Sequence, residues 1–261
     1  MLLRKILPLI IVFAFINPVW SQPTPKVVHI YVALCDNKYQ GIVPVPAKIG
    51  NGDDPKNNLY WGAMYGVKTY FKKSRDWKIV GAKKNQSSII LERLVFKHST
   101  KNVYLVADAY RGKNIKEATS DFLKSTSGGN KETIVLKGKS KSRTIKIGGH
   151  SNLLAYIGHN GLMDFQLDHY PEKENNGKRE TIILACVSKK YFTQPIKRAG
   201  AKPLLWTTNF MAPEAYTLKG ALDGWIRNES NSQIRLRSAK AYHQYQKCGI
   251  KGAMRLFVTG W

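Results

Sequence analysis

The sequence predicts an α/β protein, a three-layer sandwich with a mostly parallel central sheet. Short apolar runs rich in Val, Ile and Leu recur along the chain between polar or turn-forming residues, which is typical of strands buried on both faces. Segments with helical spacing of apolar residues separate these runs, and strands separated by helices favour parallel pairing. With 261 residues and 43% hydrophobic content, the chain can bury one sizeable core without a second domain.

The first 21 residues have the three parts of a secretory signal peptide. A basic start, MLLRK, precedes the apolar run ILPLIIVFAFI, and Ser21 is a small residue suited to cleavage, with Val19 two positions before it. We therefore predict a signal peptide over residues 1–21 and a single domain over residues 22–261. The apolar run is short for a membrane span and no other stretch matches its length. The mature protein is expected to be exported, to the periplasm or the extracellular space, without a transmembrane anchor.

Strands and helices alternate in the first half of the mature chain. The β-rich run over residues 26–36 is typical of a central strand and ends at Cys35 and Asp36. A loop rich in Pro and Gly follows over residues 40–55, and residues 57–73 carry apolar side chains at helical intervals. The other elements expected here are strands over 77–84, 92–98 and 103–110, a helix over 111–129, and a basic hairpin or surface excursion over 136–149.

The second half continues the alternation and ends in helices. We expect strands over residues 153–158, 181–186 and 203–209, and helices over 189–200, 211–225 and 238–249. Pro213 suits the start of one helix, and Gly249 suits the end of the last one.

The chain is strongly basic, with 42 Lys and Arg against 17 Asp and Glu and a formal net charge of +25 at pH 7. Such a charge favours anionic partners, including nucleic acid and components of a cell envelope. The basic residues are scattered and form no helix-turn-helix, zinc-finger or RNP-type motif. A solvated basic surface is therefore the simpler interpretation, and an anionic surface ligand is the alternative.

The chain has three cysteines, Cys35, Cys186 and Cys248. This number is small and odd, so the cysteines do not form a disulfide framework in which every thiol is paired. A bond between Cys35 and Cys186 remains open. The chain has no C-x-x-C or H-E-x-x-H spacing, no G-x-S-x-G elbow and no Walker loop, so no metal and no cofactor is expected.

Two apolar runs each end on a reactive side chain. LLAYIGHNG leads to His159 and Gly161, and TIILACVS leads to Cys186. If both runs are parallel strands, these residues lie at the carboxyl edge of the sheet, where open α/β folds collect their active sites. An imidazole beside a thiol provides a base and a nucleophile near neutral pH.

Each of these residues also has a simpler interpretation. A single histidine at a strand end is more often a turn residue than a catalyst, and a single cysteine is most often a small buried hydrophobe. His150 and His169 are alternative bases, although neither follows the pattern of a strand and a glycine.

The order of apolar run, His159, Gly161, second apolar run and Ala185-Cys186 resembles the caspase-hemoglobinase superfamily of cysteine peptidases, which includes caspases, legumain and gingipains. The resemblance extends over most of residues 22–261, but only the two strand ends are specific. It implies a caspase-like fold for the domain. It also implies a Cys-His dyad in which Cys186 attacks the scissile carbonyl and His159 protonates the leaving amine.

The resemblance also assigns binding roles. The backbone N–H groups of Gly161 and Cys186 would hold the oxyanion. The loop after the first strand would contribute Asp36 to the substrate pocket, with Asp53 and Asp54 as alternatives. The segment after the cysteine strand and its helix would line the substrate with Trp206, Thr207 and Thr208, although a plain core role is the alternative for Trp206.

Two departures from the family pattern leave active and inactive members both open. Asn160 separates His159 from Gly161, and Leu184 stands where the family usually has an acidic or amide residue. The predicted function is an exported cysteine peptidase-like protein that acts on peptide or protein substrates. The alternative is a noncatalytic binding protein that holds an anionic envelope or nucleic-acid ligand.

Overall fold

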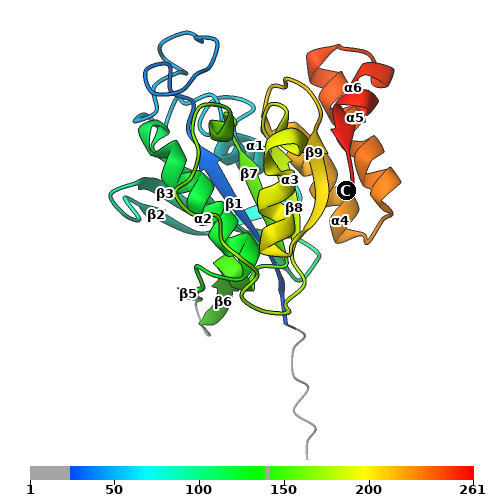
Figure 1. Cartoon of the computed structure of the whole chain (residues 1–261). Coiled ribbons are helices and arrows are strands. Elements are labelled where there is room, and N and C mark those ends of the chain that lie inside the picture. The colour runs from blue at the N-terminus through cyan, green and yellow to red at the C-terminus, as the bar shows by residue number, and fades with distance from the viewer. Residues whose placement is uncertain (1–23, 139–141) are drawn as a thin grey trace, which may run out of the picture.

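The structure, a computed structural model, describes residues 24–138 and 142–261, and its centre is a sheet of eight strands (Figure 1). The strands are β1 (Lys26–Ala33), β2 (Trp77–Lys84), β3 (Ile90–His98), β4 (Val103–Tyr110), β7 (Leu153–Ile157), β8 (Glu180–Leu184), β9 (Lys202–Thr207) and β10 (Phe257–Val258). Their order is β10-β9-β8-β7-β1-β4-β3-β2. The five strands from β9 to β4 are parallel, while β10, β3 and β2 pair antiparallel at the two edges. The predicted α/β fold with a mostly parallel sheet is confirmed.

Helices cover both faces of the sheet and complete three layers. In Figure 1, α2 (Ile115–Ser127) and α3 (Ser188–Ala199) lie in front of the sheet. The helices α1 (Val67–Lys73), α4 (Ala215–Ile226) and α5 (Asn231–Gln246) pack on the other face. Strand β1 is buried on both sides, because Ile30 and Val32 pack with the layer of α1 and α4, and Tyr31 and Ala33 pack with α2 and α3. This double burial explains its nearly continuous apolar sequence.

The strands β5 (Glu132–Leu136) and β6 (Arg143–Ile147) form a separate hairpin, whose first strand largely precedes the basic segment 136–149 that was expected to form a hairpin or a surface excursion. Ile145 and Ile147 of this hairpin pack against Val27 of β1 and Val106 of β4. The hairpin therefore extends the layer of α2 at the end of the sheet where β1 begins.

The helix expected over residues 57–73 is much shorter in the structure, where only Val67–Lys73 is helical. The preceding residues form successive turns in which backbone lies against backbone. A Cβ atom on Gly66 would stand 2.5 Å from backbone atoms of Trp61, so the glycine permits this close approach. The apolar spacing over these residues reflects burial of a turn, which sequence periodicity does not distinguish from a helix.

The end of the chain also differs from the prediction. Helix α5 begins at Asn231, where the side chains of Ser230 and Gln233 form a capping box, and it ends at Gln246. Gly249 precedes a further helix, α6 (Ile250–Leu256), which leads into the edge strand β10. The capping box begins the helix seven residues before the predicted start at residue 238.

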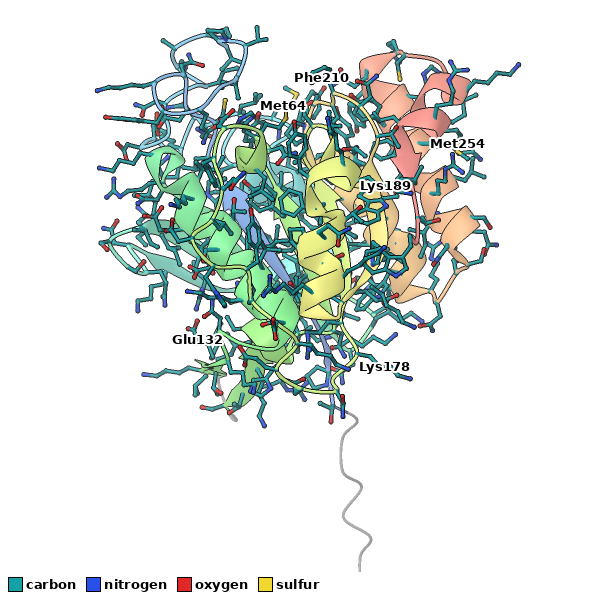
Figure 2. All side chains as sticks on the ribbon, viewed as in Figure 1. Met64, Glu132, Lys178, Lys189, Phe210 and Met254 are labelled. Carbon is teal, nitrogen blue, oxygen red and sulfur yellow. The ribbon has the colours of Figure 1, made fainter. Side chains whose placement is uncertain are left out.

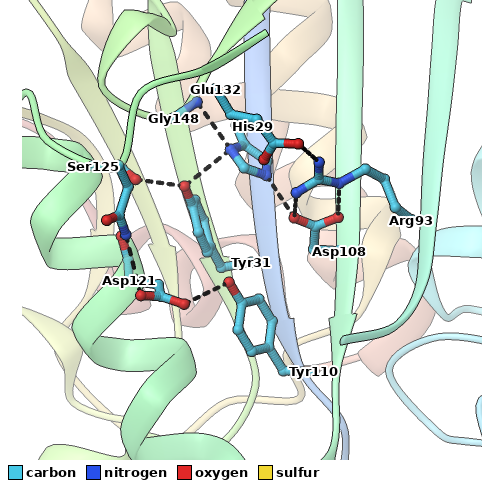
Figure 3. A network of polar contacts seen from close by, with 10 residues as sticks. His29, Tyr31, Arg93, Asp108, Tyr110, Asp121, Ser125, Glu132 and Gly148 are labelled. Atoms are coloured by element: carbon cyan, nitrogen blue, oxygen red, sulfur yellow. Dashed lines mark hydrogen bonds and ion pairs between the residues drawn. The ribbon is translucent and has the colours of Figure 1, made fainter. Parts of the chain in front are cut away.

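A buried polar network joins five elements on the side of α2 (Figure 3). The carboxylate of Asp108 on β4 accepts hydrogen bonds from Arg93 on β3 at 2.6 and 2.7 Å and lies 2.9 Å from Nε2 of His29 on β1. The Tyr31 hydroxyl lies 2.9 Å from Nδ1 of that histidine and 2.6 Å from Oγ of Ser125 on α2. Arg93 also donates to Glu132, which ties the hairpin to the sheet.

None of the helices within residues 24–138 and 142–261 is long and apolar enough to cross a membrane. The signal peptide predicted over residues 1–21 lies outside the described residues.

Candidate active site

The register of β7 and β8 brings His159 and Cys186 together. Ile157 is paired with Leu184 in this parallel ladder, and each reactive residue follows its strand by the same two positions. Neighbouring strands lie about 4.8 Å apart, so the two backbones leave the sheet side by side at its carboxyl edge. His159 and Cys186 both line one pocket of ≈ 320 Å³ at this edge.

The pocket is built from loops at the ends of four strands. The loop after β1 contributes Ile42, Val43 and Tyr60, and the segment after β9 contributes Phe210 and Met211. Gly158 and Met163 flank His159 on the loop after β7. Gly158 has φ of +149°, and a Cβ atom there would stand 2.8 Å from the carbonyl oxygen of Ala33. The glycine therefore lets the chain turn sharply beside β1 just before the histidine.

Cys186 lies in a tight turn between β8 and α3. Val187 has φ of +51°, a left-handed conformation that is rare for a β-branched residue, and α3 begins at the next residue. Ser188 donates its N–H to Thr207 Oγ1 at 3.1 Å, and Thr207 donates its own N–H to Ser188 Oγ at 2.9 Å. The Thr207 hydroxyl also donates to the carbonyl of Ala185. These bonds bracket Cys186 on both sides and offset the strain of the turn.

The Cys186 thiol is partly exposed, and among the described residues its hydrogen-bond contacts are with Met211 alone. Met211 donates its N–H to the sulfur at 3.4 Å, and the thiol lies 3.6 Å from the Met211 carbonyl oxygen. Burial raises the pKa of Cys186, although the contact with Met211 acts in the opposite direction. The thiol is therefore neutral at pH 7 unless a base removes its proton.

His159 is buried and held by a carboxylate that sequence reasoning missed. Its Nε2 atom lies 2.7 Å from Oδ2 of Asp164, which also accepts the N–H of Gly41 at 3.0 Å. Tyr156 donates to the His159 carbonyl at 2.9 Å, and Nδ1 has no hydrogen-bond partner among the described residues. Asp164 follows the histidine by five positions, but this spacing belongs to no motif, and only the helical turn at Gly161–Met163 brings the carboxylate back to the ring.

The inserted Asn160 supports the cysteine from the neighbouring strand end. Its amide Nδ2 donates to the Cys186 carbonyl at 2.7 Å, while Oδ1 is buried without a partner in the described chain. The N–H groups of Gly161 and Cys186 have no acceptor among the described residues. The α-carbon of Gly161 faces Phe165, whose ring would lie 2.4 Å from a Cβ atom there, and Gly161 is not among the residues that line the pocket.

Tyr60 forms the pocket wall next to the end of β1. Its loop is pinned there by Asn58, which accepts the N–H of Cys35 at 3.1 Å and donates to the Cys35 carbonyl at 2.8 Å. Burial raises the pKa of the Tyr60 phenol well above its ordinary value, and the nearby thiols of Cys35 and Cys186 raise it further. Tyr60 is therefore a neutral phenol at pH 7.

All three cysteines are free thiols. Cys35 and Cys186 follow β1 and β8, and these strands are separated by β7. Two strand spacings amount to about 10 Å, beyond the Cα separation of about 7 Å that a disulfide can bridge. A bond between Cys35 and Cys186 would therefore require backbone movement. Burial raises the pKa of Cys35 to about 11, so this thiol is neutral at pH 7.

None of the residues expected to bind substrate belongs to the lining of the pocket. The Asp36 carboxylate is buried and accepts the N–H groups of Lys38 and Tyr39 at 2.9 and 3.3 Å. Asp53 pairs with Arg111 at 2.5 Å. Asp54 accepts the backbone N–H of Lys56 at 3.0 Å.

The three residues at the end of β9 have different surroundings. The Trp206 ring is fully buried on the side of α3, 5.6 Å from the ring of Trp261. Thr207 holds the cysteine turn, as described above. Thr208 donates to the carbonyl of Arg255 at 2.9 Å and lines a second hollow beside the pocket. Phe210, Met211 and Pro213, which follow Thr208 by two, three and five residues, are the members of this segment that line the pocket.

The alternative bases lie elsewhere. His150 precedes β7, at the opposite edge of the sheet from His159, and His169 is exposed on the loop after β7 without lining the pocket. Within the parts of the chain that the structure describes, no group of three or more His, Cys, Asp or Glu side chains could hold a metal ion.

Comparison with known proteins yields no match to this chain among protein-family models, curated proteins or solved structures.

Proposed function

We propose that this protein is an exported cysteine peptidase of the caspase-hemoglobinase type, with Cys186 as nucleophile and His159 as the group that transfers protons. One observation carries the proposal. Both side chains line the same pocket at the carboxyl edge of the sheet, and Asp164 holds one ring nitrogen of His159 while the other has no partner in the described chain. Export rests on the signal-peptide pattern of residues 1–21.

The chemistry follows from the state of the thiol. Because burial raises the pKa of Cys186, His159 must accept the thiol proton as the sulfur attacks the scissile carbonyl. A bond between sulfur and carbon forms, the C–N bond breaks, and the imidazolium gives its proton to the departing amine. Water then attacks the thioester, with His159 again accepting a proton, and releases the carboxylic acid and the restored thiol.

The neighbouring residues have supporting roles in this reaction. Asp164 orients the imidazole and stabilises its protonated form, as a carboxylate does in related triads. Asn160 holds the Cys186 carbonyl, so the N–H of Cys186 keeps its direction. That N–H is the first group we assign to the oxyanion, because Cys186 lines the pocket and its N–H has no acceptor among the described residues. The N–H of Gly161 likewise has no acceptor there and is the second donor that we propose from the family pattern, although Gly161 itself is buried and does not line the pocket.

Peptide turnover and thiol labelling test the proposal directly. We expect the reduced wild-type protein to cleave members of a fluorogenic peptide library and Cys186→Ala to cleave none. His159→Ala should lower kcat/KM by about 100-fold or more, the usual contribution of a general base. The matched control is His169→Ala, an exposed histidine outside the pocket that should keep wild-type activity.

Iodoacetamide labelling resolved by mass spectrometry adds a pH test with an internal reference. Cys248 is exposed and lies outside the pocket, so it reports a thiol without this base. In the wild type, Cys186 should be labelled faster than Cys248 at pH 7. In His159→Ala, labelling of Cys186 should rise only above the ordinary thiol pKa of about 8.5, because burial opposes the thiolate. Labelling of Cys186 that does not depend on His159, together with no peptide cleavage, contradicts the proposal.

A hollow of ≈ 400 Å³ at the opposite edge of the sheet favours a second candidate function, the binding of an anionic ligand. Its lining includes the cationic residues Lys26, Lys178, Arg179 and Lys202 and also two carboxylates, Glu180 and Glu229. Arg179 is engaged by backbone carbonyls, and Figure 2 shows Lys178 at the lower end of the molecule. Lys178 and Lys202 have no ion-pair partner among the described residues. These lysines lie at the opposite edge of the sheet from Cys186 and His159, so binding of an anion there does not require a catalytically active thiol.

Binding measurements with Cys186→Ala protein test this candidate. A fluorescent single-stranded oligonucleotide and vesicles containing phosphatidylglycerol serve as probes. Binding through phosphates should weaken steeply between 50 and 200 mM salt, on the order of 10³-fold for several contacts. The double variant Lys178→Glu, Lys202→Glu should weaken binding far more than the charge-matched control Lys83→Glu, Lys84→Glu on β2. Equal losses of affinity in the two variants would show that binding depends on the net charge alone and that the hollow is not a binding site.

A further inference from the structure

We infer that the pocket beside Cys186 selects an apolar side chain on the substrate residue whose carbonyl is attacked. The inference rests on the proposed function and specifies its substrate class. The residue on the acyl side of the scissile bond is the one whose side chain enters the pocket, because Cys186 and His159 are themselves part of the pocket wall. At ≈ 320 Å³, the pocket is at the small end of the range of about 300–1,000 Å³ for ligand sites, which suits one side chain.

The lining offers no charge to pair with a charged substrate side chain. His159, Cys186 and Tyr60 are its only ionisable residues, and no Lys, Arg, Asp or Glu belongs to the described lining. The nearby Asp164 carboxylate is engaged by the His159 ring and the Gly41 N–H. Although the chain has a net charge of +25, no cationic side chain among the described residues lines this pocket, so an acidic substrate side chain would be buried there without a partner. A basic substrate side chain would likewise be buried without a carboxylate in the described lining.

The walls of the pocket fit flexible apolar groups. Met163 and Met211 are unbranched and adapt to different shapes, while Ile42 and Tyr60 provide firmer apolar surface. This combination favours Leu, Met and Phe over a side chain with a polar end.

The mouth of the pocket carries apolar side chains that a monomer in water would ordinarily bury. Val43 is 87% exposed and Phe210 is 69% exposed, and they come from the loops after β1 and β9. Figure 2 shows Phe210 at the upper end of the molecule, where the parallel strands finish. Exposed apolar groups on the rim of a pocket indicate contact with an apolar partner.

A second hollow indicates that the substrate is a chain and not a small isolated molecule. Phe210 lines both the pocket and this hollow of ≈ 470 Å³, which also has Asn209 and Arg255 in its wall. A peptide whose apolar side chain fills the pocket can therefore continue across Phe210 and form polar contacts beyond it.

A panel of fluorogenic peptides that differ only at the acyl-side residue tests the inference. We expect kcat/KM for Leu, Met and Phe to exceed that for Lys, Asp and Asn by about tenfold or more, the usual range for one side chain in an apolar pocket. Met163→Glu should shift the preference toward Lys, because it adds the missing negative charge to the wall. The matched control is Val80→Glu, which adds the same charge at an exposed apolar position on β2.

The outcomes separate the inference from the function on which it rests. Cleavage that prefers Lys, Asp or Asn overturns the apolar pocket and leaves the peptidase intact. An unchanged preference in Met163→Glu, with normal folding by circular dichroism, also overturns it. Failure to cleave any peptide, combined with labelling of Cys186 that does not depend on His159, overturns the proposed function itself.

Discussion

Thr207 shows how a single side chain determines the position of the candidate nucleophile. From the sequence it is a candidate for the substrate wall, and in the structure it is fully buried between β9 and the turn after β8. Its hydroxyl accepts the N–H of Ser188 and donates to the carbonyl of Ala185, so both neighbours of the Cys186–Val187 pair are fixed by one residue. The role is one of positioning, since the side chain does not line the pocket.

Replacing this hydroxyl by a methyl group should therefore displace Cys186. We expect Thr207→Val to lower the free energy of unfolding by about 1–3 kcal/mol, because the Ser188 N–H and the Ala185 carbonyl lose a buried partner. The rate of Cys186 labelling should fall as well. Urea unfolding and mass spectrometry measure the two effects.

Thr181→Val is the matched control for this prediction. Thr181 is a buried threonine on β8 whose Oγ1 lies 3.4 Å from the Lys202 carbonyl, away from the pocket. It should affect stability without slowing the labelling of Cys186. Similar labelling rates in the two variants would show that Thr207 does not position the cysteine.

At the scale of elements, the network around Asp108 joins β1, β3, β4, α2 and the β5–β6 hairpin. Burial alone raises the pKa of Asp108, but the hydrogen bonds and charges of Arg93 and His29 outweigh it, and the net pKa is lowered. The folded state therefore holds this carboxylate ionised. Its contribution to stability is present above the unfolded pKa of about 3.9 and is lost as the pH falls through the lower folded pKa.

Asp108→Asn should destabilise the protein by about 3–5 kcal/mol at pH 7, because it leaves Arg93 buried with only part of its partner charge. Urea unfolding of wild type and variant from pH 7 to pH 2 measures the difference. That difference should stay constant down to about pH 4 and shrink below it, since protonation removes the same charge from the wild type.

The double variant Arg93→Met, Asp108→Asn provides the comparison. It should be less destabilised than Asp108→Asn alone, because no unpaired buried charge remains. A difference between wild type and Asp108→Asn that is independent of pH would mean that the charge of Asp108 does not stabilise the fold.

At the scale of the whole molecule, the two edges of the sheet have different chemistry. The carboxyl edge carries a mostly apolar pocket with the thiol and the imidazole, and the amino edge carries a charged hollow lined by Lys26, Lys178 and Lys202 together with Glu180 and Glu229. The large positive charge therefore does not extend into the candidate active site. A parallel sheet produces this separation, because all strand starts lie at one edge and all strand ends at the other.

The sequence by itself determined the sheet and the meeting of two reactive residues. Apolar runs such as those before His159 and Cys186 are local signals of buried strands, and parallel pairing requires that their ends share an edge. Hydrophobic periodicity was also sufficient to predict where most of the helices occur along the chain. It failed for residues 57–66, where the apolar side chains of a buried turn have helical spacing.

Only the tertiary structure decided which groups surround the thiol. Asp164 meets His159 through the conformation of a loop, and Met211 meets Cys186 across segments far apart in the chain. Thr207 became a positioning residue because the register of β9 places its hydroxyl against the cysteine turn. Such contacts depend on loop paths and on packing between distant elements. Local sequence patterns do not predict these contacts, because the same residues satisfy their hydrogen bonds equally well in many other conformations.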